Sequence, residues 1–164
     1  MKEVRGEMEL ILSQAHFSRI VEHARAEAPN EACGLLAGQG GYVTHVLPAT
    51  NVAENPLVGY LMDPHDQIRH FQAIEEKGLD LLGIYHSHPV SPAYPSPTDL
   101  SMAYYPEAVY VIISLMRSDS PVLRAFRMVD GQVSEVTFQM APSEAADDNA
   151  SALPREAIED SIQP

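Results

Sequence analysis

Apolar positions follow a helical period in two parts of this chain. Between residues 14 and 28 they recur three or four residues apart, and they do so again between residues 64 and 77. Ser13 precedes the first stretch and Asp63-Pro64 opens the second, in the positions that N-terminal caps and first-turn prolines occupy. The pattern predicts two amphipathic helices, with Gly78 at the C-terminal cap of the second.

Shorter apolar runs, bounded by Gly, Pro, Asn and Asp, predict strands. The runs cover residues 8–12, 31–38, 42–48, 80–87, 108–115, 122–129 and 133–139. Glycines at 38–41 and Asp130-Gly131 are typical hairpin turns. A proline-rich loop over residues 89–97 leads to a short helix over 97–103. We therefore predict an α/β fold with a mixed sheet flanked by helices, not a parallel doubly wound one.

The length of the chain and one shift in composition predict its domain organisation. The chain has 164 residues, of which 45% are hydrophobic, enough for one core. Residues 141–164 contain six acidic residues, one Arg and few large apolar side chains. We predict one domain over residues 1–140 and an acidic, disordered tail over 141–164.

Charge and cysteine content exclude several classes of protein. A formal net charge of −13 disfavours binding to nucleic acid or to an anionic membrane surface. A single cysteine excludes a disulfide scaffold and a Cys-rich zinc site. The first residues lack a signal-peptide core and no apolar run approaches about 20 residues, so a cytoplasmic location is expected. The acidity is also compatible with a halophilic source.

Two histidines close the predicted strand over 80–87. His86 and His88 lie two residues apart, so their imidazoles face the same side of a strand. Two imidazoles on a rigid strand end suit a divalent ion, most commonly zinc. The alternative is a pair of histidines that serve packing alone.

A candidate third ligand follows the proline-rich loop. In Ser96-Pro97-Thr98-Asp99, Ser96 suits a helix N-cap and Asp99 stands three residues later. A capping role and a metal-binding role are compatible, because a cap fixes both side chains. Two His and one Asp would leave a fourth position open for water.

Glu31 is a candidate general base, because an acidic residue ahead of the apolar run Ala32–Leu36 is costly unless it has a purpose. The alternative is an exposed carboxylate at the start of a strand. Cys33 lies in an apolar strand and is expected to be a structural thiol. The remaining histidines are expected to be surface or packing residues: His16, His23, His45, His65 and His70.

Taken together, these residues resemble the JAMM (MPN+) metalloprotease family. The signature stands as Glu31 followed by His86-x-His88-x₇-Ser96-x-x-Asp99. The resemblance implies a single MPN-type, cytidine-deaminase-like domain. It also implies one catalytic zinc held by His86, His88 and Asp99, with Glu31 as general base and Ser96 supporting the oxyanion. One departure is mild, since Ile84 stands where the family often has an aromatic residue.

The compact body resembles the stand-alone prokaryotic branch of that family. The resemblance implies a zinc peptidase or isopeptidase, like the deubiquitinases, that acts on ubiquitin-like or sulfur-carrier proteins ending in Gly-Gly. Two alternatives stay open: a non-catalytic scaffold of the same fold, and a different His-x-His metal amidohydrolase or phosphoesterase. A zinc nucleobase deaminase is excluded, because its Pro-Cys-x-x-Cys needs two cysteines.

Overall fold

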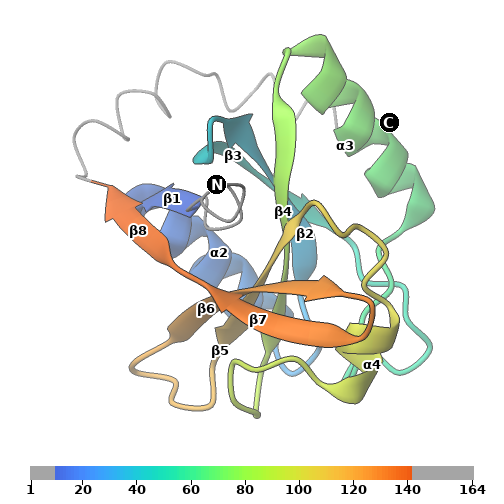
Figure 1. Ribbon diagram of the computed structural model, residues 1–164. Coiled ribbons are helices and arrows are strands. Elements are labelled where there is room, and N and C mark those ends of the chain that lie inside the picture. Colours follow the sequence, from blue (N-terminus) through green and yellow to red (C-terminus); the bar gives the residue numbers. More distant parts are fainter. Residues whose placement is uncertain (1–9, 142–164) are drawn as a thin grey trace.

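The computed structural model describes residues 10–141 as a curved sheet of eight strands with three helices (Figure 1). The strands are β1 (Leu10–Ser13), β2 (Cys33–Gln39), β3 (Tyr42–Ala49), β4 (Asp80–His88), β5 (Val109–Ser114), β6 (Val122–Val129), β7 (Gln132–Val136) and β8 (Phe138–Ala141). The helices are α2 (Gln14–Glu27), α3 (Pro64–Glu76) and α4 (Pro97–Ser101). The predicted mixed α/β fold is confirmed.

The sheet is nearly closed, because its two edge strands follow each other in the chain. The strand order is β7-β6-β5-β4-β2-β3-β1-β8, with β7 antiparallel to β6 and β8 parallel to β1. Only Thr137 separates β7 from β8, and Figure 1 shows the chain passing from one edge to the other. The prediction of one strand over residues 133–139 is therefore wrong. Curvature brings the edges close enough for one extended segment to pair with both.

Helix α2 covers one face of the sheet. Its apolar residues Ile20, Val21 and Ala24 are buried against side chains from β1 to β7, including Leu36 and Val111. The predicted cap is present, since the Ser13 hydroxyl accepts a hydrogen bond from the His16 amide at 3.0 Å. The helix ends at Glu27, one residue before the predicted limit.

Helices α3 and α4 cover the opposite face. Met62 and Ile74 pack there against Leu35 of β2, Ile84 of β4 and Tyr110 of β5. Side chains alternate between the two faces along each strand. On β4, Tyr85 therefore faces the core under α2, whereas Ile84 and the histidines that follow face the α3–α4 side.

Strands β2 and β4 approach closely at Gly34. A Cβ atom there would lie 2.5 Å from the Tyr85 ring and 2.6 Å from the Leu47 carbonyl oxygen, so this position requires glycine. The close approach fixes the register in which Cys33 lies opposite His86. The residue before β2 is thereby held at the level of the end of β4.

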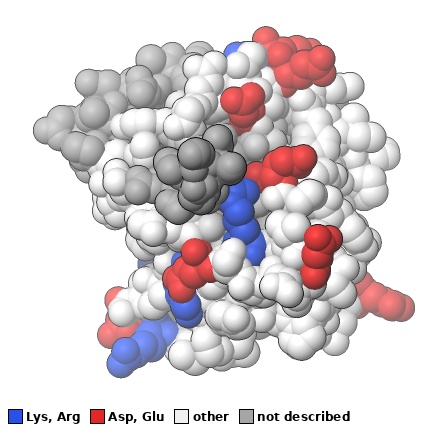
Figure 2. All heavy atoms as spheres, viewed as in Figure 1, with Lys and Arg blue, Asp and Glu red and all other residues white. Residues whose placement is uncertain are grey.

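The surface shown in Figure 2 carries acidic side chains between narrow groups of basic ones, and no broad basic area lies on this face. Within residues 10–141, no helix is long and apolar enough to span a bilayer. The predicted acidic tail lies outside the described residues, except for Ala141, which ends β8.

Candidate active site

His86 and His88 end β4 between β2 and β5, and both are almost fully buried. Both imidazoles lie on the α3–α4 side, as the two-residue spacing predicts. The ring of Tyr60 stacks on His86, with centroids 4.6 Å apart and an angle of 27° between the planes. The strand and this aromatic neighbour hold His86 in one orientation.

Ser96 and Asp99 form the predicted cap of α4. The Ser96 hydroxyl accepts a hydrogen bond from the Asp99 amide at 3.0 Å, and Asp99 Oδ2 accepts one from the Ser96 amide at 2.9 Å. Pro97 occupies the first helical turn. The reciprocal bonds orient the Asp99 carboxylate toward the end of β4. The helix is shorter than predicted, because it ends at Ser101.

Three candidate ligand atoms converge at this point. His86 Nε2 and His88 Nε2 lie 3.2 and 3.1 Å from Asp99 Oδ2, and 3.1 Å from each other. Ligands about 2.0 Å from a tetrahedral zinc ion lie about 3.3 Å apart, so the spacing fits that ion. Among residues 10–141 this is the one converging group of three His, Cys, Asp or Glu side chains.

The protonation of His88 also fits a cation. Its Nδ1 lies 2.8 Å from the Pro92 carbonyl oxygen, which can only accept, so Nδ1 carries a proton and donates it. In the neutral ring, Nε2 is then the atom free to bind a metal, and a carbonyl that accepts from the other ring nitrogen is typical of a metal-ligating histidine. Without a metal, burial lowers the pKa of His88, but its hydrogen bond to Asp99 outweighs that effect and raises the pKa. Burial would raise the pKa of Asp99, but its contacts with the two histidines hold that pKa far below the usual range.

Glu31 lies two residues before β2, not inside the strand as predicted. The antiparallel register brings it to the level of His88. The residue is 5% exposed, and its Oε1 has no hydrogen-bond partner among the described residues. Burial raises the pKa of Glu31 to about 7, against the charge of His88, which lowers it. A buried carboxyl with a free oxygen suits a group that exchanges protons with a substrate or water.

The side chains of Asn51 and Ser87 hold the backbone at Glu31 and Ala32, and neither was identified from the sequence. Asn51 Nδ2 donates to the Glu31 carbonyl at 2.9 Å, and the Glu31 amide donates to the Pro56 carbonyl at 2.8 Å. The next residue is fixed by Ser87, whose hydroxyl accepts from the Ala32 amide at 2.8 Å. An Asn after a strand and a Ser between two histidines are the only signals the sequence offers for these contacts.

The other histidines take the structural positions expected of them. His16, His45 and His70 are buried, and His65 is exposed. His23 Nδ1 lies 2.7 Å from the Tyr85 hydroxyl. The Cys33 thiol is fully buried, and burial raises its pKa to about 12, so it fits a structural role.

The fold and these residues define a JAMM-type hydrolase domain. The chain belongs to the family of prokaryotic homologues of the JAB domain, whose family model matches residues 13–129. The family, the fold and the class of enzyme expected from the sequence are confirmed.

Curated relatives with assigned activities cover most of this domain. The CysO-cysteine peptidase of Mycobacterium tuberculosis is 38% identical over 128 residues, which are 77% of this chain and 87% of the relative. The probable TtuB-protein conjugate cleaving protease of Thermus thermophilus is 43% identical, over 67% of this chain and 70% of its own. The desampylase of Haloferax volcanii is 45% identical, over 58% and 73%.

Two solved structures are similar in fold to this chain. The solution structure of a protein from Desulfitobacterium hafniense matches with a TM-score of 0.75 and 34% identity, covering 83% of this chain and 96% of the other. A JAB1/MPN domain protein from Archaeoglobus fulgidus has a TM-score of 0.52 and 18% identity, over 79% and 97%, and supports the fold alone.

Proposed function

We propose that this chain is a zinc-dependent peptidase that cleaves the bond after the C-terminus of a ubiquitin-like or sulfur-carrier protein. The convergence of His86, His88 and Asp99 beside the buried Glu31 is the observation that carries the proposal. The donor set of two imidazoles and one carboxylate suits catalytic zinc and leaves a position for water. A cytoplasmic location is part of the proposal.

Each residue of the site has one role in the proposed reaction. A zinc ion bound by His86, His88 and Asp99 would polarise the scissile carbonyl and lower the pKa of a water molecule toward about 7. Glu31 accepts a proton from the attacking water and later donates it to the leaving amine. Ser96 donates a hydrogen bond from its hydroxyl to the carbonyl oxygen as negative charge develops there. The products are a free carboxylate and a free amine.

Ser96 is suited to that role by its hydrogen bonding. Its hydroxyl oxygen accepts from the Asp99 amide, and no acceptor for its own proton lies among the described residues. The cap therefore fixes the oxygen and leaves the proton available for a substrate. The cost of losing such a donor is typically about 10²–10³ in kcat.

The relatives support the substrate class. Their names assign them to a CysO-cysteine adduct and to TtuB-protein conjugates. We propose that the substrate of this chain likewise has a carrier protein on the acyl side of the scissile bond, with a small molecule or a protein as the leaving group. We propose that the carrier of this chain ends in Gly-Gly, which suits a narrow groove because glycines bring no side chains.

The ligand residues that each function needs distinguish the proposed peptidase from a non-catalytic scaffold and from a different metal hydrolase. A non-catalytic scaffold has no need of a metal ligand set, whereas His86, His88 and Asp99 are all present with converging atoms. A different His-x-His metal hydrolase needs further His or Lys ligands. The other histidines within residues 10–141 belong to no converging group of His, Cys, Asp and Glu side chains.

The test uses small carrier proteins with a short extension after Gly-Gly, and mass spectrometry identifies the products. The expected result is cleavage directly after Gly-Gly, abolished by a chelator and restored by zinc. Efficient cleavage of unrelated peptides with intact Gly-Gly extensions would reject the carrier and leave the hydrolase. A carrier series with Ala-Ala in place of Gly-Gly is the matched control.

A further inference from the structure

The two candidate histidine ligands differ in the contact of their second ring nitrogen. His88 Nδ1 lies 2.8 Å from the Pro92 carbonyl oxygen, to which it donates. His86 Nδ1 is buried and has no hydrogen-bond partner among residues 10–141. Histidines that bind a metal through one nitrogen almost always donate the N–H of the other to an acceptor, which fixes the plane of the ring. The described residues give the His86 ring no such restraint.

The backbone alone does not fix the ring of His86. At this residue β4 pairs with Cys33 of β2 and with Ile112 of β5, so the main chain is held on both sides. The imidazole can still turn about its two side-chain bonds. Such a turn would move Nε2 away from Asp99 and His88. A contact with the ring itself is therefore required to keep the three ligand atoms together.

Tyr60 supplies a contact of this kind. Its ring lies nearly parallel to the His86 ring, with centroids 4.6 Å apart and an angle of 27° between the planes. This geometry is within the range of offset-stacked aromatic pairs. When Nε2 binds a cation, the imidazole takes on part of the positive charge, and the face of a neighbouring aromatic ring attracts a positive group. The stack thus favours both the orientation and the metal-bound form of His86.

Main-chain hydrogen bonds place Tyr60 beside the end of β4. The Val52 amide donates to the Leu61 carbonyl at 2.8 Å, and the Asp63 amide donates to the Thr50 carbonyl at 2.9 Å. These two bonds form an antiparallel bridge that begins one residue after Tyr60. Backbone pairing therefore sets the position of the ring, and this pairing involves no metal ligand.

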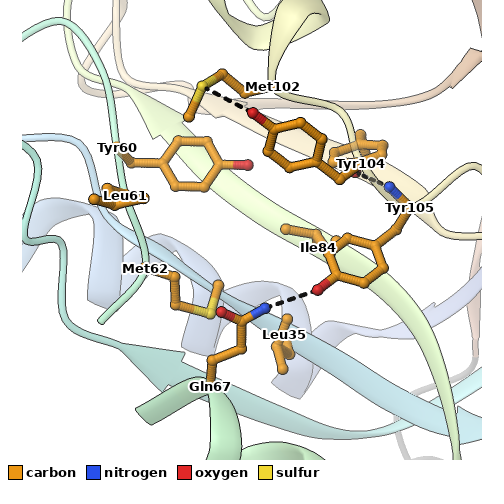
Figure 3. Close-up of a pocket in the computed structure, with 10 residues that line it drawn as sticks. Leu35, Tyr60, Leu61, Met62, Gln67, Ile84, Met102, Tyr104 and Tyr105 are labelled. Atoms are coloured by element: carbon orange, nitrogen blue, oxygen red, sulfur yellow. Dashed lines mark hydrogen bonds between the residues drawn. The ribbon is translucent and has the colours of Figure 1, made fainter. Parts of the chain in front are cut away.

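The Tyr60 ring also separates His86 from a cavity. The cavity, of about 100 Å³, lies on the α3–α4 side of the sheet, and Tyr60 lines it whereas His86 does not (Figure 3). Leu35, Ile84 and Met102 form other parts of its wall. A smaller side chain at position 60 would leave the His86 ring facing open space. The imidazole would then have room to turn.

We infer that Tyr60 is a positioning residue of the metal centre, whose ring keeps His86 Nε2 directed at Asp99 and His88 in place of a hydrogen bond at His86 Nδ1. The inference rests on the proposed function, because that function places zinc on these three residues. Stacking needs the aromatic ring and not its hydroxyl group. Tyr60 therefore influences how tightly the metal is held without being a ligand itself.

The test compares wild type with Tyr60→Leu and Tyr60→Phe. Competition with a chromophoric chelator measures the dissociation constant for zinc, and the absorption spectrum of the cobalt-loaded protein reports on the geometry of the ligands. We expect Tyr60→Leu to bind zinc about 10–100-fold more weakly, the usual effect of losing a residue that orients a ligand. Its cobalt absorption bands should shift or weaken. Tyr60→Phe should keep the affinity and the spectrum of wild type.

Tyr105→Leu is the matched control. Tyr105 lines the same cavity, and its aromatic contact is with Phe71. The same substitution therefore enlarges the same cavity without uncovering a candidate ligand. We expect zinc affinity and the cobalt spectrum to stay unchanged. The melting temperature of each metal-free variant shows that it is folded.

The outcomes separate the role of Tyr60 from the proposed function. Wild-type zinc affinity in Tyr60→Leu, or an equal loss in Tyr105→Leu, would overturn the inference and leave the proposed function intact. A large loss in Tyr60→Phe would also overturn it, because the hydroxyl group and not the ring would then hold the site. That comparison remains decisive even where Tyr60→Leu does not fold. A wild-type protein that binds no zinc would overturn both the inference and the proposed function.

Discussion

At the residue scale, the protonation of Glu31 determines when the site can act. Its pKa is raised to about 7 from an ordinary value of 4.5, mainly by burial, with opposing effects of His88 and Asp99. Only the ionised carboxylate accepts a proton, so activity is lost as pH falls through this pKa. A bound dication favours the ionised form and moves the loss to lower pH.

The raised pKa of Glu31 predicts how pH affects the metal-free protein and the zinc-loaded enzyme. In the metal-free protein, ¹³C NMR of the Glu31 carboxyl should show a titration midpoint near 7, and zinc should lower it. In the zinc-loaded enzyme, kcat/KM should fall about tenfold per pH unit below the lowered midpoint. Ser96→Ala should reduce the rate and keep the same midpoint. A metal-free midpoint near 4.5 would contradict the account.

The candidate ligand residues illustrate what a sequence can predict at this scale. The positions of His86 and His88 on one face follow from strand periodicity, and the orientation of Asp99 follows from a local cap. Both are set within a few residues of chain. Asn51 and Ser87 act instead across 20 and 55 residues of separation, which no local pattern encodes.

At the element scale, the segment between β3 and α3 positions the start of β2. Asn51 holds this segment together, because its Oδ1 accepts from the Ala53 and Leu61 amides while its Nδ2 donates to the Glu31 and Gly59 carbonyls. The same segment carries Tyr60, which stacks on His86. One side chain thereby links the candidate base to a neighbour of a candidate ligand.

Asn51→Ala should therefore reduce both stability and rate. Leaving these partly buried groups unpaired should cost about 1–3 kcal/mol of the free energy of unfolding. We also expect a lower kcat with unchanged zinc content, because Glu31 loses its backbone support and the ligands do not. Asn55→Ala is the matched control, since Asn55 is exposed and accepts one bond at 3.4 Å from Leu57. Denaturation and steady-state kinetics would measure both, and an Asn51 variant with wild-type kcat would contradict the role.

At the scale of the whole molecule, the near-closure of the sheet is the feature that the sequence did not predict. The run at 133–139 has the alternation of one strand, and local pattern alone cannot place a break at Thr137. The break depends on the curvature of all eight strands and on the free edge of β1. Element types, which local periodicity sets, were predicted well, whereas this pairing needed the complete fold.

The acidic segment after β8 gives a prediction for the whole chain. Its composition predicts no contribution to the core, so deletion of residues 142–164 should leave the melting temperature and zinc content nearly unchanged. Ala141 must be kept, because it is buried at the end of β8. Thermal denaturation of both chains measures this. A large drop in melting temperature would show that the segment docks on the domain.

The most direct measurement compares wild type and Glu31→Gln, both analysed for zinc and assayed on one extended Gly-Gly carrier. The account predicts one zinc per chain in both proteins, with hydrolysis at least about 100-fold slower in the variant, because Glu31 exchanges protons and is not a ligand. Zinc below about a tenth of an equivalent in wild type would contradict the ligand assignment. Wild-type hydrolysis by Glu31→Gln, or loss of its zinc, would contradict the role of Glu31.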